Sequence, residues 1–316
     1  MPKSVLLTGY RGFIGQAVLH ELEMRGHVVY GVDAETYAAQ PGARSPAQWR
    51  RLDINDLEHL PAEVDVILNL AAETHVDNAI TDPGRFLRSN TLGVHHLLAL
   101  LAGRGGYRSP RFVQVSTDEV YGDGYTDTVD EEAALRPSNP YAASKAAADL
   151  FLEAHHRTYG TPYQIIRPSN CYGPGQYPEK LIPKAVRCLH LRKRIPVHGD
   201  GQQVRTWLHV DDAARAIVDI VERGEENLAY NLCGDTTCSV LVVVNAVVEA
   251  WNTQQGTHRR LDQVVEFHRV RPGMDRRYRV SDARVRMLGW QPEHRLFDSL
   301  ATLLPLELSR SAAERW

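Results

Sequence analysis

The sequence has few cysteines, almost no excess of charge and no long apolar run. Its four cysteines lack the spacing of a metal site, so we expect reduced thiols in a cytoplasmic protein and no bound metal. A net charge of −3 over 316 residues does not favour a nucleic-acid partner. No stretch approaches the roughly 18 apolar residues that span a bilayer, and residues 1–4 lead directly into a strand pattern. We therefore expect neither membrane contact nor a secretory signal.

Glycines near the N-terminus predict a dinucleotide-binding loop. Residues 4–8 form a short apolar run typical of a buried strand, and Gly9, Gly12 and Gly15 follow it before a helical pattern begins. Glycines spaced by three let the backbone turn tightly and approach a pyrophosphate at a helix N-terminus. The spacing differs from the commoner Gly-x-Gly-x-x-Gly, and alone it would also fit a glycine-rich turn.

The end of the next apolar segment indicates which dinucleotide binds. Residues 28–32 read as a second strand, and Asp33 follows at the distance expected of a ribose-binding carboxylate. Such a carboxylate accepts hydrogen bonds from a ribose 2′-hydroxyl and repels a 2′-phosphate, which favours NAD over NADP. Arg11, a cation in the glycine loop, opposes this reading because it could serve a phosphate. We give Asp33 more weight and predict NAD.

Strand and helix patterns alternate through the first half of the chain. This alternation predicts an α/β fold, with a Rossmann-type doubly wound parallel sheet and a smaller α/β substrate-binding lobe. We expect strands at about 4–8, 27–33, 48–54, 64–71, 111–117 and 162–169, and helices at about 12–25, 83–103 and 140–159. Beyond residue 171 we expect shorter helices at about 179–193, 211–223 and 239–252, and a polar helical tail at 306–316.

The change in pattern near residue 171 suggests where the domains divide. We assign residues 1–170 to the dinucleotide-binding domain and residues 171–316 mainly to the substrate-binding lobe. The two are expected to interleave, because later segments at about 200–232, including a strand at 228–232, would return to the first domain.

Motif residues repeatedly follow the predicted strands. Gly9 follows the first strand, Asp33 the second, residues 71–74 the fourth and Ser116 the fifth. Ligands of parallel α/β sheets bind at the carboxyl ends of the strands. The clustering therefore predicts one site at this edge of the sheet.

Two neighbouring motifs supply acid–base chemistry. Tyr141 and Lys145 are four residues apart, so they share a helix face, and a lysine beside a phenol favours the phenolate. Thr117 is followed at once by Asp118 and Glu119. The two carboxyls could form a solvated turn, but beside a tyrosine base they suggest that water is removed as well as hydride. A dehydrogenase would need only the tyrosine.

With these motifs the sequence resembles the extended short-chain dehydrogenase/reductase superfamily and, within it, the dTDP-glucose 4,6-dehydratases. The Tyr-x-x-x-Lys pair marks only the superfamily, whereas Thr-Asp-Glu together with Pro-Glu-Lys-Leu-Ile-Pro is specific to the dehydratases. The resemblance runs from Gly9 to about Trp290 and includes residues 70–77, 90–93, 116–122, 141–145, 169–174, 177–183, 205–207 and 271–278.

The resemblance implies a three-step reaction on a nucleotide sugar. Tyr141 takes the proton of the C4 hydroxyl as NAD accepts the hydride, while Lys145 stabilises the phenolate and Thr117 binds the C4 oxygen. Glu119 removes the C5 proton as a base, and Asp118 protonates the departing C6 hydroxyl as an acid. Hydride then returns to C6, so NAD stays bound and is regenerated. The pattern does not show which carboxyl has the raised pKa.

The resemblance also implies the binding residues, with residues 171–316 forming mainly a nucleotide-sugar-binding lobe. The cofactor contacts would be Gly9, Gly12, Phe13, Ile14, Gly15, Asp33, Asp53, Ile54, Leu70, Ala71, Ala72, Thr74, Ser116, Tyr141, Lys145 and Asn170. The substrate contacts would be Thr74, His75, Thr117, Asp118, Glu119, Asn170, Glu179, Lys180, Leu181, Pro196, His198, Arg205, Asn231 and Arg271.

Three departures from the family pattern leave the nucleotide open. Met274 stands where a histidine is usual, His198 where a tyrosine is usual and Cys171 where an asparagine is usual. We predict dTDP-glucose as the substrate, with UDP-glucose as the alternative. A 4-epimerase or decarboxylase on the same scaffold, and a catalytically silent dinucleotide sensor, are the rival interpretations.

The resemblance finally implies a homodimer. The helices expected at 83–103 and 140–159 would pair with those of a second copy in a four-helix bundle.

Overall fold

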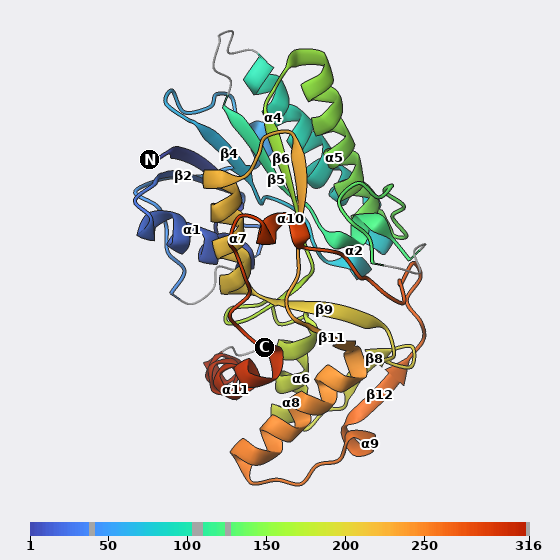
Figure 1. Cartoon of the computed structure of the whole chain (residues 1–316). Helices are drawn as coiled ribbons and strands as arrows, with labels where there is room; N and C mark the ends of the chain where they lie inside the picture. The colour runs from blue at the N-terminus through green and yellow to red at the C-terminus, as the bar shows by residue number, and fades with distance from the viewer. Residues whose placement is uncertain (38–41, 103–109, 124–127, 314–316) are drawn as a thin grey trace.

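Seven parallel strands form the central sheet of the larger lobe (Figure 1). The computed structural model describes residues 1–37, 42–102, 110–123 and 128–313. The strand order of the central sheet is β3-β2-β1-β4-β5-β6-β10. The order reverses between β1 and β4, which is where ligands of such sheets bind. The strands are β1 (Ser4–Thr8), β2 (Val28–Asp33), β3 (Gln48–Arg51), β4 (Val66–Asn69), β5 (Arg111–Val115), β6 (Tyr163–Pro168) and β10 (Leu228–Leu232).

Helices cover both faces of this sheet, which confirms the predicted fold class. On one face, α1 (Phe13–Met24) and α7 (Val210–Arg223) pack against Leu7. On the other, α4 (Gly93–Ala102) and α5 (Pro140–Tyr159) pack against Leu6. Successive side chains of a strand point to opposite faces, so a strand covered on both sides reads as a continuous apolar run. This explains the uninterrupted apolar pattern of the first strand.

The predicted helix at 83–103 is interrupted in the structure. It consists of α3 (Pro83–Phe86), a π-helical stretch η2 (Leu87–Leu92) and α4, and residue 103 lies outside the described residues. Within η2, Asn90 Nδ2 donates to Ser144 Oγ at 2.9 Å, and Thr91 Oγ1 donates to the Ser144 carbonyl at 3.0 Å. The wider turn thus turns polar side chains toward α5, a tertiary contact that helical periodicity does not reveal.

Two other predicted elements differ at their ends. The third strand ends at Arg51, because Asp53 caps a short 3₁₀ turn, η1 (Ile54–Asp56), by accepting from Asn55 N at 2.9 Å. The C-terminal helix is α11 (Leu296–Ala313), which begins well before residue 306. Its buried Leu300 and Leu304 face the core of the smaller lobe, so it is more than a polar tail, and residues 314–316 lie outside the described part of the chain.

The smaller lobe is built from two small sheets and a group of helices (lower half of Figure 1). One sheet has the order β11-β9-β7 and the other pairs β12 with β8. Ile182, Val247 and Leu300 belong to its apolar core. Its elements are β7 (Asn170–Tyr172), α6 (Leu181–His190), β8 (Ile195–His198), β9 (Val204–His209), β11 (Thr236–Ser239), α8 (Val240–Gln255), α9 (Leu261–Val264) and β12 (Val265–His268). The short helix α10 (Ala283–Arg286) returns to the larger lobe, where its Val285 joins the core beside β10.

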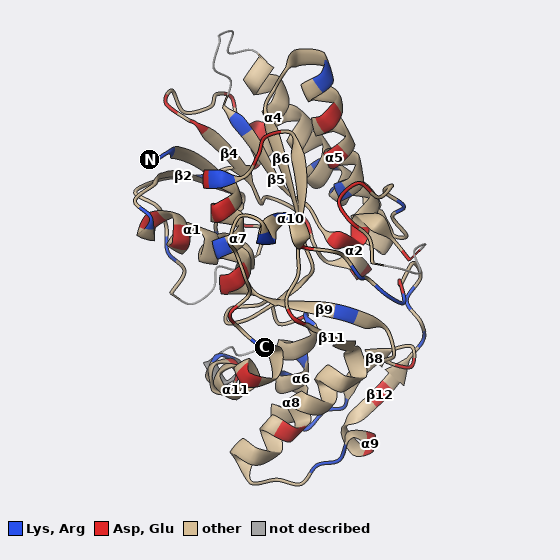
Figure 2. Cartoon of the chain, viewed as in Figure 1, with Lys and Arg blue, Asp and Glu red and all other residues tan. Residues whose placement is uncertain are grey.

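Lys and Arg positions and Asp and Glu positions are interspersed along the ribbon of both lobes in Figure 2. Within the described ranges, no helix combines the length and apolar character needed to cross a bilayer.

Candidate active site

A cavity of about 820 Å³ lies where the carboxyl ends of the central strands meet the smaller lobe. Its walls come from both lobes. Every residue that the sequence predicted for the cofactor or the substrate lines it, except His75 and Asn231. The single site expected from the clustering of motifs at strand ends is therefore present as one continuous cavity.

The glycine loop forms one end of this cavity and fits a pyrophosphate. Gly9 has φ +67°, and a Cβ there would lie 2.6 Å from Ala71 N; a Cβ on Gly15 would lie 2.2 Å from the Gly9 carbonyl oxygen. Larger residues would therefore push the loop and the strand ends apart. Gly12 is the N-cap of α1 and gives it no side-chain cap, and the first turn of α1 has no acidic residue. The N–H groups of this turn thus remain available for an anion.

The opposing signals from Asp33 and Arg11 are resolved by their contacts. The Asp33 carboxylate accepts from Arg11 N at 2.9 Å and from Glu35 N at 2.7 Å, which holds it at the end of β2 in the cavity wall. The Arg11 guanidinium instead forms an ion pair with Glu35 at 3.0 Å and donates to Ser45 Oγ at 3.1 Å. Since Glu35 neutralises Arg11, the loop presents a carboxylate to the ribose, as NAD requires.

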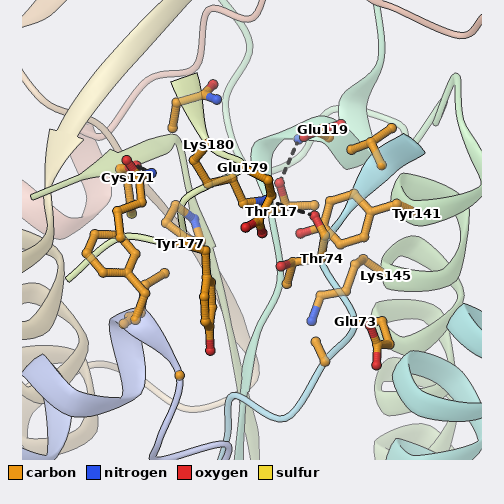
Figure 3. Close-up of a pocket in the computed structure, with 18 of the residues that line it drawn as sticks. Glu73, Thr74, Thr117, Glu119, Tyr141, Lys145, Cys171, Tyr177, Glu179 and Lys180 are labelled. Carbon is orange, nitrogen blue, oxygen red and sulfur yellow. Dashed lines mark hydrogen bonds between the residues drawn. The ribbon is translucent and has the colours of Figure 1, made fainter. Parts of the chain in front are cut away.

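The acid–base residues meet at the centre of the cavity (Figure 3). Tyr141 and Lys145 project from α5 toward Thr117, which follows β5. Thr117 Oγ1 accepts from Glu119 N at 3.3 Å and so caps the 3₁₀ turn η3 (Asp118–Tyr121). The two motifs identified in the sequence thus face each other across the site.

Asn139 connects these two motifs, a role that we did not predict from the sequence. Its side chain caps α5 by accepting from Ala142 N at 2.9 Å, and its Nδ2 donates to Glu119 Oε2 at 3.1 Å. One amide therefore fixes both the start of the helix that carries Tyr141 and the orientation of the Glu119 carboxylate.

The structure decides which carboxyl of the pair has the raised pKa. Asp118 is 2 % exposed, and Oδ2 has no hydrogen-bond partner among the described residues. Burial, followed by repulsion from Glu119, raises the pKa of Asp118 to about 8, although Arg205 opposes the effect. Asp118 therefore carries a proton at neutral pH, as a general acid requires.

The pair of Tyr141 and Lys145 is less activated than the sequence suggested. Burial raises the pKa of Tyr141, the charge of Glu119 adds to this, and a hydrogen bond with Thr117 opposes it. Lys145 Nζ donates to the Val115 carbonyl at 2.6 Å, and burial lowers the pKa of Lys145 to about 8. In this arrangement the lysine therefore does not produce the lowered tyrosine pKa that the four-residue spacing suggested.

Two predicted substrate contacts lie elsewhere. His75 is the N-cap of α2 (Val76–Thr81) and accepts from Asn78 N at 3.3 Å. Asn231 is fully buried within β10, where its Oδ1 accepts from the Tyr121 hydroxyl at 2.9 Å. Neither residue lines the cavity. Both were assigned by sequence position alone, which does not reveal the direction of a side chain.

The cavity wall contains a cluster of charged and aromatic side chains that the sequence did not predict. Glu73 accepts from Arg85 Nη2 at 2.6 Å and from the Tyr37 hydroxyl at 3.3 Å, and the Tyr37 ring lies 5.0 Å from the Tyr177 ring. These four residues come from separate loops and α3, so they have no common period in the sequence. Glu73 and Tyr177 lie within segments that resemble the dehydratases, and Arg85 lies within a predicted helix, but no sequence pattern relates the four residues to one another.

The smaller lobe supplies cations and the three residues that depart from the family pattern. Arg205 is held by the Val204 and Asp275 carbonyls, both at 2.8 Å. Arg271 lies 3.5 Å from Asp77, and its buried Nε has no partner among the described residues. The departures Cys171, His198 and Met274 all line the cavity as well.

One group of metal-ligand types lies outside the cavity, formed by His209, Asp211 and His294. The two imidazole rings stack face to face at 4.0 Å, and His294 Nδ1 is already hydrogen-bonded to Asp212 Oδ1 at 3.0 Å. Stacked rings hold their nitrogen lone pairs parallel rather than convergent, so this cluster is better described as a polar contact between α7 and the C-terminal segment.

The parallel sheet, the glycine loop and the Tyr–Lys pair define a dinucleotide-dependent enzyme. Residues 5–233 match the NAD dependent epimerase/dehydratase family. The chain is 41% identical to a dTDP-glucose 4,6-dehydratase of Streptomyces griseus, over 95% of this chain and 93% of that protein. It is 34% identical to a trifunctional UDP-glucose 4,6-dehydratase of Arabidopsis thaliana, over 92% of this chain and 45% of that longer protein.

A solved structure agrees with this relationship. The dTDP-glucose 4,6-dehydratase of Streptomyces venezuelae, crystallised with NAD and TYD, superposes with a TM-score of 0.89 at 32% identity, over 98% of both chains. The chain therefore belongs to the NAD-dependent epimerase/dehydratase family, and within it to the dTDP-glucose 4,6-dehydratases. It is an NAD-dependent hydro-lyase by family.

Proposed function

We propose that this chain converts dTDP-glucose to dTDP-4-keto-6-deoxyglucose. The observation that carries the proposal is the buried carboxyl of Asp118, with its pKa raised to about 8, beside Glu119 and in the same cavity as Tyr141. Oxidation at C4 needs one base, whereas loss of water across C5 and C6 needs a further base and an acid. The site contains all three, and an epimerase would have no use for the last two.

The residue roles follow from these positions. Tyr141 accepts the proton of the C4 hydroxyl as the phenolate, although burial in the cavity raises its pKa, and Thr117 holds the C4 oxygen. Glu119, oriented by Asn139, removes the C5 proton that the new ketone has acidified. Asp118 donates its proton to the departing C6 hydroxyl. NAD held at the glycine-loop end of the cavity would supply the hydride chemistry at C4 and C6, so the protein's task is to hold both carbons against that end.

The diphosphate would lie against Arg205 and Arg271. Both line the cavity, and the unpartnered Nε of Arg271 provides a donor in addition to the guanidinium nitrogen that faces Asp77. The base would lie near His198 and Met274, as the family resemblance implies. We propose the thymidine nucleotide on the relationship to the dTDP-glucose enzymes and keep UDP-glucose as the alternative, because these two positions depart from the family pattern.

The test is to incubate the purified protein separately with dTDP-glucose and UDP-glucose, without added reductant. The 4-keto-6-deoxy product is followed by its alkali-induced absorbance, with Tyr141→Phe as the inactive control. Product mainly from dTDP-glucose supports the proposal. Product mainly from UDP-glucose would retain the dehydration and overturn the choice of nucleotide. A C4 epimer, or no product from either sugar, would refute dehydration itself.

We further propose that the chain forms a homodimer through η2, α4 and α5. Leu87, Leu92, Leu150 and Phe151 are each about half exposed, and the Phe151 ring lies 6.0 Å from His95 on α4. A second copy presenting the same face would bury these side chains in a four-helix bundle. Phe151→Glu should then give a monomer in sedimentation experiments. The matched control is Phe297→Glu on α11, which changes an equally exposed phenylalanine; a dimer that survives Phe151→Glu would exclude this interface.

Two further predictions also stay proposals. We propose that residues 1–170, with segments between about 200 and 232, form the NAD-binding domain; the parallel pairing of β10 with β6 supports this division. We propose a cytoplasmic location, which the four free cysteines support.

A further inference from the structure

An ion pair between Asp149 and Arg167 is almost completely buried beside the cavity. Asp149 on α5 is 0 % exposed and Arg167 on β6 is 2 % exposed, with 3.1 Å between Arg167 Nε and Asp149 Oδ2. Neither side chain lines the cavity. Removing both charges from water is rarely repaid by their attraction alone. A contribution to stability is therefore a weak explanation for this ion pair, and the hydrogen bonds that it makes suggest a role in the active site.

Asp149 links two residues of the cofactor side. It lies one helical turn after Lys145, so the two side chains share a face of α5. Its Oδ2 also accepts from Ser116 Oγ at 3.0 Å, and Ser116 directly follows β5. Asp149 Oδ1 has no hydrogen-bond partner among the described residues. The negative charge of this oxygen therefore remains to act on Lys145.

Arg167 extends the connection to the carboxyl pair. Its Nη1 donates to the Tyr121 hydroxyl at 2.8 Å, and Tyr121 donates to Asn231 Oδ1 at 2.9 Å. Tyr121 is the last residue of η3, the turn that begins with Asp118 and Glu119. Asn231 thereby joins a continuous buried hydrogen-bond network that runs from Ser116 through Asp149 and Arg167 to Tyr121 at the end of the acid–base turn.

The charge of Asp149 acts on Lys145 directly. Burial lowers the pKa of Lys145 to about 8, and the one opposing influence is the negative charge of Asp149. Burial raises the pKa of Asp149 itself, while Arg167 is the largest influence that lowers it. Among the described residues, Asp149 is the one titratable group that affects the pKa of Lys145. The segments packed against α5 carry other titratable groups, namely Asp77 on α2, Arg85 on α3, Arg88 on η2, His95 and His96 on α4, Asp118, Glu119 and Tyr121 on η3, and Tyr163 on β6.

We propose that the Asp149–Arg167 pair is a positioning device that keeps the Lys145 ammonium charged and holds its helical turn in register with the carboxyl-bearing turn η3. Asp149 and Arg167 touch neither substrate nor cofactor, so both are positioning residues. The kinetic part of the proposal rests on the proposed dehydratase function, but the electrostatic part does not.

The kinetic test compares the pH dependence of kcat, on both sides of the Lys145 pKa of about 8, for the natural protein and Asp149→Asn. The asparagine keeps the shape and removes the charge, so the lysine should lose its proton at lower pH. The fall of kcat at high pH should therefore begin about one pH unit or more lower in the variant. At pH values below that fall, kcat should return to near the natural value. Asp149→Glu, which retains the charge, should restore the natural pH dependence.

The matched control is Asp212→Asn. Asp212 is also 0 % exposed and pairs with Arg215 at 2.6 Å, but it lies on α7 and does not line the cavity. It should lower stability without moving the fall of kcat at high pH. If Asp149→Asn only lowers stability, as the control does, the pair is structural and the proposal fails. Should Asp149→Asn not fold, Asp149→Asn/Arg167→Gln leaves no uncompensated charge and must show the same shift.

A second readout needs no substrate. Trace labelling with acetic anhydride, read by mass spectrometry, follows the uncharged amine of Lys145, which lines the cavity. Labelling should rise around pH 8 in the natural protein and at lower pH in Asp149→Asn. An unmoved labelling curve overturns the proposal whether or not the enzyme is a dehydratase. A moved curve in a protein that fails to dehydrate dTDP-glucose would sink the proposed function and leave the positioning role standing.

Discussion

Replacing Asp118 with asparagine should make the protein more stable and less active. Burial holds Asp118 in its neutral form, with a pKa of about 8 in place of 3.8. The unfolded chain ionises the same carboxyl near pH 4. Between these values the folded state binds a proton that the unfolded state does not, so the natural protein loses stability as pH rises from about 4 to about 8. An asparagine at this position has no proton to lose.

The size of the effect follows from the two pKa values. A change from 3.8 to about 8, at about 1.4 kcal/mol for each pH unit, gives an upper bound of about 6 kcal/mol. Glu119 and Arg205 share in this change, and the cavity admits water, so we expect a measured gain of about 1–3 kcal/mol at pH 8.5. The gain should be smaller at pH 5 and should level off above pH 8.

Calorimetric unfolding of Asp118→Asn and the natural protein at pH 5, 7 and 8.5 tests the stability. Turnover should fall by about 10²–10⁴-fold because the C6 hydroxyl leaves without a general acid. Exchange of the substrate C5 proton with deuterated water should persist, because Tyr141 and Glu119 are unchanged. A variant that is less stable than the natural protein at pH 8.5, or whose stability follows the same pH curve, would refute a neutral buried Asp118.

Three further outcomes are expected. Glu119→Gln should lose both turnover and C5 exchange, each by about 10²–10⁴-fold, and exchange at the natural rate would assign the C5 base elsewhere. Asp33→Asn should bind NAD more weakly and narrow the preference for NAD over NADP, measured by calorimetric titration; an unchanged preference would mean that another group reads the ribose. In the natural enzyme, kcat should fall as pH rises through about 8, since burial places the pKa values of both Asp118 and Lys145 there, and a flat profile to pH 9.5 would contradict both.

The sequence by itself determined the class of fold and most of the cavity wall. Strands buried on both faces must be apolar throughout, and glycines must stand where a Cβ would strike the neighbouring backbone, as at Gly9 and Gly15. These are local requirements, so they leave a local pattern. The carboxyl ends of parallel strands then have to meet at one edge, so the strand pattern alone predicts that Asp33 and Thr117 belong to one site.

Only the tertiary structure decided how the site works. The pKa of Asp118 depends on how deeply it is buried and on the position of Arg205 as well as on the adjacent Glu119, and neither the burial nor Arg205 is local in sequence. Arg11 is excluded as the partner of a ribose phosphate because it forms an ion pair with Glu35, a contact that the sequence does not reveal. His75 and Asn231 matched the family by position but do not line the cavity, because each side chain is engaged by a neighbouring element instead. Electrostatics and orientation depend on distances through space, and a linear sequence does not contain those distances.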